Sequence, residues 1–510
     1  MYDAVVIGSG HNGLVAAGYL ARAGRNVLIL ERRDIIGGAC ATEELFPGFR
    51  FSSCSFMLYA LHPKIVRDME LQKYGFELFD VQPHEFRPFP DGRHLIFWRD
   101  AERNAEAIRS FSVKDAENYP RWNDFWERAY SITRPFGLTP PPSLADLLQR
   151  ARETGSEQLF ETLLTTCHAD LVDEFFESEQ VRGAVVHSGD HGNPYVVGSS
   201  FPSAFLPGDV DTEIRIVGIV KGGMGSITAA MAEYVQSEGA SIRTGCEVRR
   251  VIVEQGAAKG VELSSGEEIR SELVVSNADP KRTFLKLVDA EHLTDDFRSQ
   301  VARLKTEIAY LKFHAAMDEL PDFSAYLGPD YDPRITARVW ISPSVDYVQR
   351  AWADARAGRP SQDPVMSIQI PSVYDDTICP AGKHVLSIFS EYAPVQLASG
   401  TWDDRRQEVG EALIDSVSAY APNFRQAIRE WMLLTPFDIE RRVYLTDGNI
   451  HHLDQVPGQM FSRRPLPGWA EYKTPIDGLW LCGAGTHPGG EVSGAPGHNA
   501  AHAILSETGA

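Results

Sequence analysis

Residues 2–31 read YDAVVIGSGHNGLVAAGYLARAGRNVLILE, and this stretch decides the fold class. Tyr2 to Gly8 and Asn26 to Glu31 each contain four consecutive apolar residues, and Gly13 to Ala23 between them have the composition of a helix. Two strands that are apolar on both faces, joined by a helix, are typical of a βαβ unit in a parallel sheet. The stretch therefore predicts an α/β fold.

The turn after the first strand, Gly8-Ser9-Gly10-His11-Asn12-Gly13, has the spacing of a dinucleotide-binding loop. Gly8 permits a tight turn, Gly10 lets the backbone approach a pyrophosphate, and Gly13 lets the helix pack against the strand. The helix then offers free N–H groups and a positive dipole end to the phosphates, and His11 and Asn12 of the turn are also assigned to the cofactor.

Glu31 ends the second strand at the spacing where a carboxylate accepts hydrogen bonds from ribose hydroxyls. Such a carboxylate disfavours a 2′-phosphate. NAD and FAD remain equal alternatives at this point, because both contain adenosine diphosphate.

The next residues, ERRDIIGGACAT, separate the two cofactors. They resemble the glycine-doublet motif of the flavoprotein superfamily that contains amine oxidases and carotenoid desaturases. The resemblance implies FAD, with this segment along the pyrophosphate and the approach to the flavin ring. The residues it assigns to the cofactor are Arg32, Arg33, Gly37, Gly38, Ala39 and Thr42.

The far end of the chain carries a second glycine-rich turn, GLWLCGAGTHPGG over residues 478–490. It resembles the C-terminal flavin motif of the same superfamily, which implies that Gly483, Gly485, Glu491 and Val492 contact the cofactor. The following helix would point its positive end at the flavin, which stabilises an anionic reduced ring. Val248 matches the position where the superfamily holds the adenine.

These motifs predict a Rossmann-type FAD-binding domain with a mixed-sheet and helical substrate domain. Alternating stretches such as YLKFHAAM, PVMSIQIP and KHVLSIFSEY suit an antiparallel sheet with one covered face, and the segment from about Arg87 to Glu179 suits an α-rich cap. The predicted division is 1–86, 215–285 and 445–510 for the FAD-binding domain, and 87–214 and 286–444 for the substrate-binding and cap domain.

Within the superfamily the chain most resembles the phytoene desaturase-like branch, which includes retinol saturase. The resemblance implies hydride transfer between flavin N5 and a carbon of an apolar small molecule. Such chemistry depends on alignment of the substrate with the flavin and on exclusion of water more than on reactive side chains. Aromatic residues of the cap either wall the substrate pocket or form the cap's own core: Trp122, Phe125, Trp126, Tyr130, Phe136, Phe175 and Phe176.

Proton-transfer candidates are Glu491 and His487 beside the C-terminal turn and His191 in VVHSGDHGNPY, with His187 and His498 as weaker alternatives. A carboxylate in an apolar bend near a flavin has a raised pKa and can exchange protons near neutrality. Cys40 has Leu45 where a disulfide reductase would have its second cysteine, so no redox disulfide is expected. The six cysteines have no metal-type spacing, and no metal is expected.

Charge and hydropathy limit the kinds of partner and the cellular location that the sequence predicts. The net charge of −21 repels a phosphate backbone, so nucleic acid is an unexpected partner. No apolar run reaches the roughly 18 residues that span a bilayer. The first strand starts at once, which predicts a cytoplasmic protein, or one of an organelle matrix if a presequence was trimmed. Peripheral membrane contact and a homo-oligomer stay open.

Two other functions share this scaffold. An amine or amino-acid oxidase is the alternative enzyme, because the sequence does not reveal the substrate cavity. A binding or regulatory protein without turnover, similar in scaffold to the GDP-dissociation inhibitors, is the alternative of a different class. The intact glycine doublet and C-terminal turn favour an enzyme.

Overall fold

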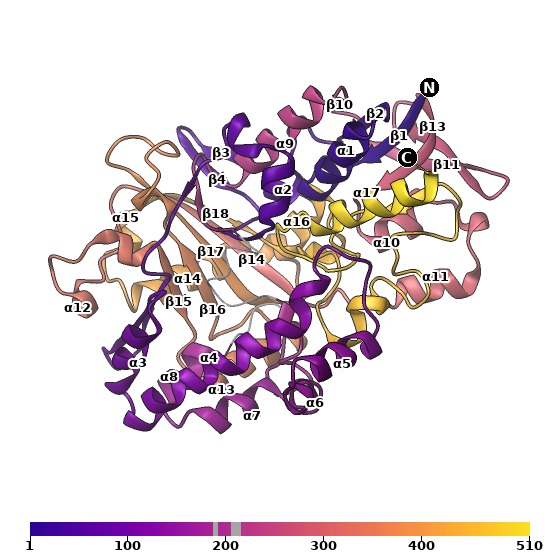
Figure 1. The fold of residues 1–510 in the computed structure, drawn as a ribbon. Helices are drawn as coiled ribbons and strands as arrows, with labels where there is room; N and C mark the ends of the chain where they lie inside the picture. Colours follow the sequence, from indigo (N-terminus) through magenta and orange to yellow (C-terminus); the bar gives the residue numbers. More distant parts are fainter. Residues whose placement is uncertain (187–191, 206–215, 510) are drawn as a thin grey trace.

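The computed structural model describes residues 1–186, 192–205 and 216–509. Two seven-stranded sheets form its framework, and helices cover their outer faces (Figure 1). The two chain termini lie near each other, next to the first sheet (Figure 1). None of the helices in the described ranges combines the length and apolar character that crossing a membrane requires.

The first sheet joins strands from the start, middle and end of the chain. β1 (Tyr2–Ile7) lies between β2 (Val27–Leu30) and β13 (Glu268–Ser276), and it is parallel to both. The predicted βαβ unit and the α/β fold are confirmed. The other strands are β10 (Ser241–Arg243), parallel to β2, β19 (Leu479–Leu481), parallel to β13, and the antiparallel β12 (Ala257–Leu263) and β11 (Val248–Glu254).

Both faces of this sheet are covered because its parallel strands are apolar on both sides. α1 (His11–Arg22), α9 (Gly225–Ser237) and α17 (Ala495–Thr508) pack on one face in a single apolar cluster. The other face packs with residues of β11, β12 and α11 (Asp295–Ala302). As in other open parallel sheets, the carboxyl ends of β1, β2, β13 and β19 meet at one edge.

The second sheet is mixed, as predicted. Its order is β18 (Ile428–Leu434), β14 (Ala309–Met317), β17 (His384–Ala393), β16 (Val365–Gln369), β15 (Arg338–Ile341), β7 (Glu85–Pro88) and β8 (His94–Phe97). β15 and β7 are parallel, and the other neighbours are antiparallel. Alternate residues such as Phe313 and Ile388 pack in an apolar core with α14 (Trp402–Ser418), which covers one face.

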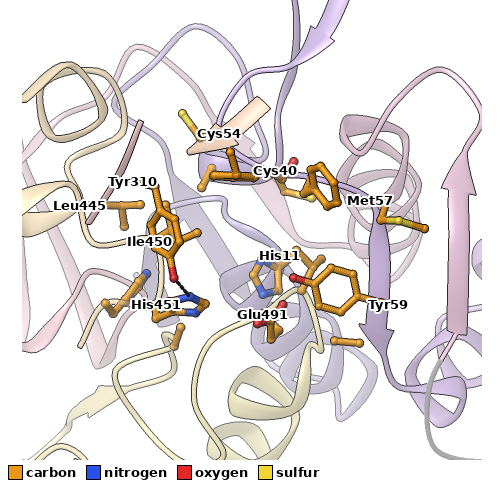
Figure 2. Close-up of a pocket in the computed structure, with 18 of the residues that line it drawn as sticks. His11, Cys40, Cys54, Met57, Tyr59, Tyr310, Leu445, Ile450, His451 and Glu491 are labelled. Atoms are coloured by element: carbon orange, nitrogen blue, oxygen red, sulfur yellow. Dashed lines mark hydrogen bonds between the residues drawn. The ribbon is translucent and has the colours of Figure 1, made fainter. Parts of the chain in front are cut away.

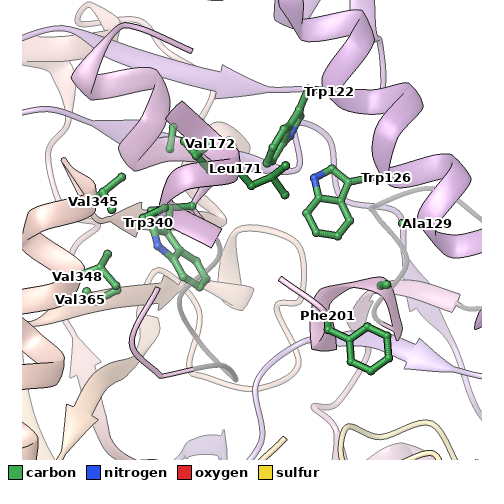
Figure 3. Packing of buried hydrophobic residues seen from close by; sticks show 14 of the residues in the cluster. Trp122, Trp126, Ala129, Leu171, Val172, Phe201, Trp340, Val345, Val348 and Val365 are labelled. Carbon is green, nitrogen blue, oxygen red and sulfur yellow. The ribbon is translucent and has the colours of Figure 1, made fainter. Parts of the chain in front are cut away.

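The cap consists of helices that follow β8. They are α3 (Ala101–Arg109), α4 (Val113–Thr133), α5 (Leu144–Glu153), α6 (Glu157–Thr165), α7 (His168–Phe175) and α8 (Glu179–Val185). Figure 3 shows Trp122 and Trp126 of α4 in the same apolar cluster as Trp340 of β15, so the cap packs toward the second sheet. β7 crosses the predicted bound at residue 86, and the division into domains stays a prediction.

Shorter elements complete the chain. They are the hairpin β3 (Thr42–Phe46) and β4 (Phe49–Ser52), the small sheet β5 (Leu58–Leu61), β9 (Ile216–Val220) and β6 (Leu78–Phe79), and the helices α2 (Pro63–Asp68), α10 (Pro280–Arg282), α12 (Ser324–Leu327), α13 (Val345–Arg356), α15 (Phe424–Ala427) and α16 (Pro436–Val443).

Candidate functional site

A cavity of about 1000 Å³ lies where the carboxyl edge of the first sheet, one face of the second sheet and the cap meet. Its wall includes Gly8 and Gly10 from the first glycine turn, Val248 from β11, Glu491 from the C-terminal turn, and Trp126 from the cap. Segments from the whole length of the chain thus border one space. Figure 2 shows part of this wall.

The first glycine turn has the close packing that its spacing predicts. Gly8 has a φ of +92°, which favours glycine. A β-carbon on Gly13 would lie 2.3 Å from the carbonyl oxygen of Gly8, so only glycine lets α1 approach β1 here. Gly8, Gly10, His11 and Asn12 line the cavity, and Gly13 packs behind them.

Asn277, at the end of β13, was missed from the sequence. A β-carbon on Gly10 would lie 2.7 Å from the side-chain nitrogen of Asn277, so this amide occupies the space that a larger residue would need. Asn277 also lines the cavity. Its signal in the sequence is its place in the turn of LVVSNADP, directly after a buried strand.

The glycine doublet lies against the first turn. The amide of Gly37 donates a hydrogen bond to the carbonyl of Ser9 (3.1 Å), and a β-carbon on Gly38 would lie 3.3 Å from Cα of Gly10. Gly37, Gly38 and Ala39 line the cavity. Thr42 lies away from the cavity wall, because its hydroxyl accepts a hydrogen bond from the Gly225 amide (2.8 Å) at the start of α9.

Glu31 and its neighbours form a polar corner of the wall. The Glu31 carboxylate accepts hydrogen bonds from the Ser9 amide (3.0 Å) and hydroxyl (2.8 Å) and from the Arg33 amide (2.9 Å). Arg32 donates to the carbonyl of Arg442 (2.6 Å). Arg33 pairs with Glu43 at 2.5 Å. Glu31, Arg32 and Arg33 all line the cavity.

Val248 lies close to this corner. The backbone carbonyl of Glu31 accepts a hydrogen bond from the Cys246 amide (2.8 Å), which ties the start of β11 to the end of β2. Val248 follows two residues later and lines the cavity. Val248 and Glu31 thus line the same cavity, and the assignment of Val248 to the cofactor remains a prediction.

The C-terminal turn contributes Ala484, Glu491 and Val492 to the wall. Gly483 and Gly485 were predicted to contact the cofactor, but they face protein. A β-carbon on Gly483 would lie 2.7 Å from the carbonyl oxygen of Asn277, and one on Gly485 would lie 2.4 Å from Pro280. These glycines bring the turn close to β13, and Ala484 between them borders the cavity.

His487 is not among the residues that line the cavity. It is buried, and its ring nitrogen Nε2 lies 2.7 Å from the carbonyl of Phe136, so it joins the C-terminal turn to the cap. Burial lowers its pKa to about 4. The ring contacts the cap backbone and is not among the cavity-lining side chains, which counts against the predicted direct catalytic role. His191 and His187 lie outside the described residues.

Glu491 has a backbone conformation that is rare for its residue type, with a φ of +67°. Strained positions of this kind cluster at functional sites. Figure 2 shows Glu491 beside His11, the first residue of α1. Burial lowers the pKa of His11 to about 4, and hydrogen bonding with the Glu491 backbone offsets part of this effect. His11 is therefore neutral at pH 7. The N-terminal and C-terminal parts of the chain meet where His11 lies beside Glu491.

Tyr310 and His451 form a second polar pair in the wall, which was missed from the sequence. The Tyr310 hydroxyl lies 3.4 Å from Nε2 of His451 (Figure 2). Tyr310 belongs to the cavity face of β14. Its signal is the alternation of Tyr310, Lys312 and His314 with apolar residues in YLKFHAAM.

Lys312 lies directly behind this wall. Its ammonium group is 3.9 Å from the centroid of Phe389, is fully buried, and has no hydrogen-bond partner among the described residues. Burial lowers the pKa of Lys312 to about 7. A lysine that exchanges its proton near neutrality is typical of functional sites.

Arg464 holds two parts of the wall in place. Its fully buried guanidinium donates to the carbonyls of Ala484 (2.8 Å) and His451 (2.8 Å), and also to those of Leu453, Asp454 and Gln459. Ala484 and His451 both line the cavity. Arg464 therefore positions the C-terminal turn against the loop that carries His451.

Some aromatic residues of the cap line the cavity, and others pack only in the cap's own core. Trp122, Trp126 and Tyr130 line the cavity. Phe125, Phe136, Phe175 and Phe176 pack in the cap core. The wall facing the cap is therefore aromatic.

Several polar atoms in the wall are buried without a partner among the described residues. Those near the first glycine turn and the C-terminal turn include His11 Nε2, Asn12 Oδ1, Arg33 Nη1 and His452 Nδ1. A buried polar group without a hydrogen bond costs about 1–3 kcal/mol, so such atoms indicate a polar ligand. Their place beside the glycine turns and Glu31 fits the phosphates and sugars of a dinucleotide. Within the described residues no cluster of side chains is arranged to hold a metal ion.

Comparison with known families agrees with this fit. Residues 13–505 match the flavin containing amine oxidoreductase family. The chain belongs to this family. Its cofactor is FAD, and it is a flavin amine-oxidase-type oxidoreductase.

The relatives also agree with the resemblance seen in the motifs. The chain is 37% identical to pyridine nucleotide-disulfide oxidoreductase domain-containing protein 2 of Rattus norvegicus, covering 99% of this chain and 94% of that protein. The C-terminal motif HPGGEVSGAPGHNAA, residues 487–501, by itself resembles this protein, and the match over the whole chain confirms that resemblance. The six cysteines are free in the structure.

Two further relatives are similar over nearly the whole chain. A limonene dehydrogenase polypeptide of Castellaniella defragrans is 28% identical, covering 99% of this chain and 95% of that protein. A neurosporene-forming phytoene desaturase of Cereibacter sphaeroides is 26% identical, covering 97% and 92%. A solved structure of a putrescine oxidase variant has a TM-score of 0.62 at 13% identity, covering 99% and 98%, which shows the shared fold.

Proposed function

We propose that FAD lies along the cavity with its adenine at Val248, its ribose at Glu31 and its pyrophosphate at the first glycine turn and the glycine doublet. The flavin ring would then lie near Ala484 and Glu491. The contacts along the wall support this order, because Cys246, two residues before Val248, bonds to Glu31, Glu31 bonds to Ser9, and His11 lies beside Glu491. Positioned this way, FAD would supply a two-electron acceptor or donor at N5.

We propose further that the substrate is an apolar molecule that gains or loses a carbon–carbon double bond. The aromatic wall beyond the glycine turns carries this proposal: Trp122, Trp126, Trp340 and Phe389 border the same cavity. Burying apolar surface contributes about 25 cal/mol per Å², so such a wall binds an apolar body and excludes water. The limonene dehydrogenase and phytoene desaturase relatives support the same substrate class.

The protein's own residues would align the substrate and hold protons. Glu491 is the proposed acid or base, because it lies in the wall at the chain-end junction. Tyr310 and His451 lie nearby and would anchor or relay a proton on the second-sheet side. The domain division given by the motifs agrees with a cofactor held by the first sheet and a substrate held by the cap and second sheet.

The test is reduction of the bound flavin by candidate substrates without oxygen. The FAD-loaded protein is mixed anaerobically with limonene-type or polyene hydrocarbons, with alkyl amines and with amino acids, and the absorbance of the oxidised flavin is followed. We expect bleaching by unsaturated hydrocarbons, or reoxidation of the reduced protein by them. Bleaching by amines alone would refute the apolar substrate.

An amine oxidase is the second candidate, because the family includes amine oxidoreductases and because Glu391, a carboxylate, lies in the cavity wall. A carboxylate there would pair with an ammonium group of the substrate. The same assay separates the two candidates. A protein that binds FAD but responds to no compound in either redox direction would favour a binding role.

A further inference from the structure

The face of the second sheet that borders the cavity carries polar and charged side chains beside the aromatic Trp340 and Phe389. Its strands alternate, so that the opposite face packs in an apolar core through residues such as Phe86, Val339 and Ile368. The cavity face carries Tyr310, Arg338, Ser367, Glu391, Glu85 and Arg87. Buried polar groups need partners, so this face is suited to a ligand that is not wholly apolar.

Three charged residues stand together on this face. Arg87 forms an ion pair with Glu85, and Nη2 of Arg338 lies 3.4 Å from the other oxygen of the same carboxylate. The side chains are only 10% exposed for Glu85 and Arg87 and 16% for Arg338. Among the described residues, two guanidinium groups around this one carboxylate carry one positive charge in excess.

Arg338 has an unused donor. Its Nε is buried and has no hydrogen-bond partner among the described residues. The guanidinium groups of Arg87 and Arg338 both lie beside the ring of Trp340, at 5.2 and 5.4 Å from its centroid, which fixes them in the wall. A fixed guanidinium with a spare N–H suits the two oxygens of a carboxylate.

The cluster lies at a distance from the flavin end of the cavity. β15 is three strands from β14, which carries Tyr310 beside His451, so the two strands lie about 14 Å apart. Phe389 of β17 and Trp340 of β15 line the cavity along this span. Glu391 is also on β17, two strands from β15 and about 10 Å away, so it does not directly neutralise the cluster.

We propose that Arg87 and Arg338, which both pair with Glu85, bind the carboxylate end of a substrate whose apolar body extends along the aromatic wall to the flavin. Within the proposed class of apolar substrates, such a site favours a long-chain carboxylic acid over a neutral molecule of the same length. This inference rests on the proposed function, because that function places the reacting carbon at the glycine-turn end.

The test compares dodecanoate with dodecanol, which share the apolar chain and differ in charge. Binding of each to the FAD-loaded full chain is measured by calorimetry and by perturbation of the flavin spectrum. A charge-assisted contact in a mostly buried site favours dodecanoate by about tenfold or more. Arg338→Gln should reduce this preference to within about twofold. Glu85→Gln removes the competing carboxylate and should increase it.

Arg334→Gln is the matched control, because this guanidinium pairs with Asp332 on the surface. It should leave the preference as in the unchanged protein. If Arg338→Gln does not fold, Glu85→Gln still decides the matter by the sign of its effect. Equal binding of the two ligands, or an unchanged preference in the variant that folds, would overturn the carboxylate site. Flavin content and bleaching are recorded on the same samples, so an unchanged protein that lacks FAD would instead count against the proposed function.

Discussion

A β-carbon on Gly497 would lie 2.2 Å from the carbonyl oxygen of Asn12, so α17 touches α1 with no room for a side chain. Asn12 lines the cavity, and Gly497 lies a few residues after Glu491. The two ends of the chain therefore pack against each other at the part of the cavity wall to which both glycine turns contribute. This contact explains why one cofactor site can be built from residues so far apart in sequence.

Gly497→Ala should separate the two helices. Overpacking of a tight contact costs about 1–3 kcal/mol, and the displaced α17 would carry the C-terminal turn away from the first glycine turn. We expect lower thermal stability and weaker retention of FAD after dialysis. Gly458→Ala is the control, because a β-carbon there meets nothing within 4 Å. Equal flavin content in both variants would show that the chain ends do not need this contact.

Glu491→Gln should leave FAD bound and slow flavin reduction by substrate. The amide keeps the size of the carboxyl group but does not exchange a proton, and general acid or base groups contribute about 10²–10⁴-fold to rates. The measurement is the rate of anaerobic bleaching in a stopped-flow instrument. The matched control is Glu233→Gln, an exposed glutamate on α9. A rate within a few-fold of the unchanged protein would remove Glu491 from the mechanism.

Lys312→Met should change how stability depends on pH. Burial lowers the pKa of Lys312 to about 7, whereas the unfolded chain keeps its ordinary value of 10.5. Between these values the unfolded state binds a proton that the folded state lacks, so the free energy of unfolding rises with pH, by up to about 1.4 kcal/mol per pH unit. The destabilisation caused by burying the charged lysine is fully present below pH 7 and absent above pH 10.5.

This contribution to the free energy of unfolding is measured by urea unfolding of the FAD-loaded protein. The pH is varied between the folded-state and unfolded-state pKa values of Lys312. The variant should be more stable than the unchanged protein at the lower end of this range, and the difference should shrink as the pH rises. Lys259→Met, at an exposed position, should keep the original pH dependence. Parallel pH profiles for the Lys312 variant and the unchanged protein would mean that the lysine titrates normally.

Arg464→Met should destabilise the site and the protein together. The substitution leaves the carbonyls of Ala484 and His451 buried without donors, and breaking a buried charged network costs about 3–5 kcal/mol. We expect a lower unfolding midpoint and loss of FAD, with partial recovery in Arg464→Lys. The neighbouring Arg463 is less buried, so Arg463→Met should behave like the unchanged protein. An Arg464→Met protein with full stability would show that these carbonyls find other donors.

The fold could be predicted because glycine and apolar runs act locally. Gly8, Gly10 and Gly13 lie between a strand and a helix, so their spacing alone fixes a turn that binds phosphates. Gly483 and Gly485 were interpreted the same way, but their small size serves packing against Asn277 and Pro280. Sequence shows that a β-carbon is excluded at a position, and it does not show whether ligand or protein excludes it.

The substrate side of the site could not be predicted to the same extent. Arg338 and Glu85 are far apart in sequence and meet only because β15 and β7 are neighbours in the second sheet. His487 lies close to Glu491 in sequence, yet it turns toward Phe136. Neither outcome follows from local patterns, because each depends on which strands pair and how the cap packs.

The most direct test of the central claim is a crystal structure of the full chain with FAD bound. We expect the adenine beside Val248, the ribose at Glu31, the pyrophosphate across Gly10 and Gly38, and the flavin ring against Ala484 and Glu491. A flavin ring found away from the C-terminal turn, or an adenine found under the cap aromatics, would contradict a cofactor held jointly by the two ends of the chain.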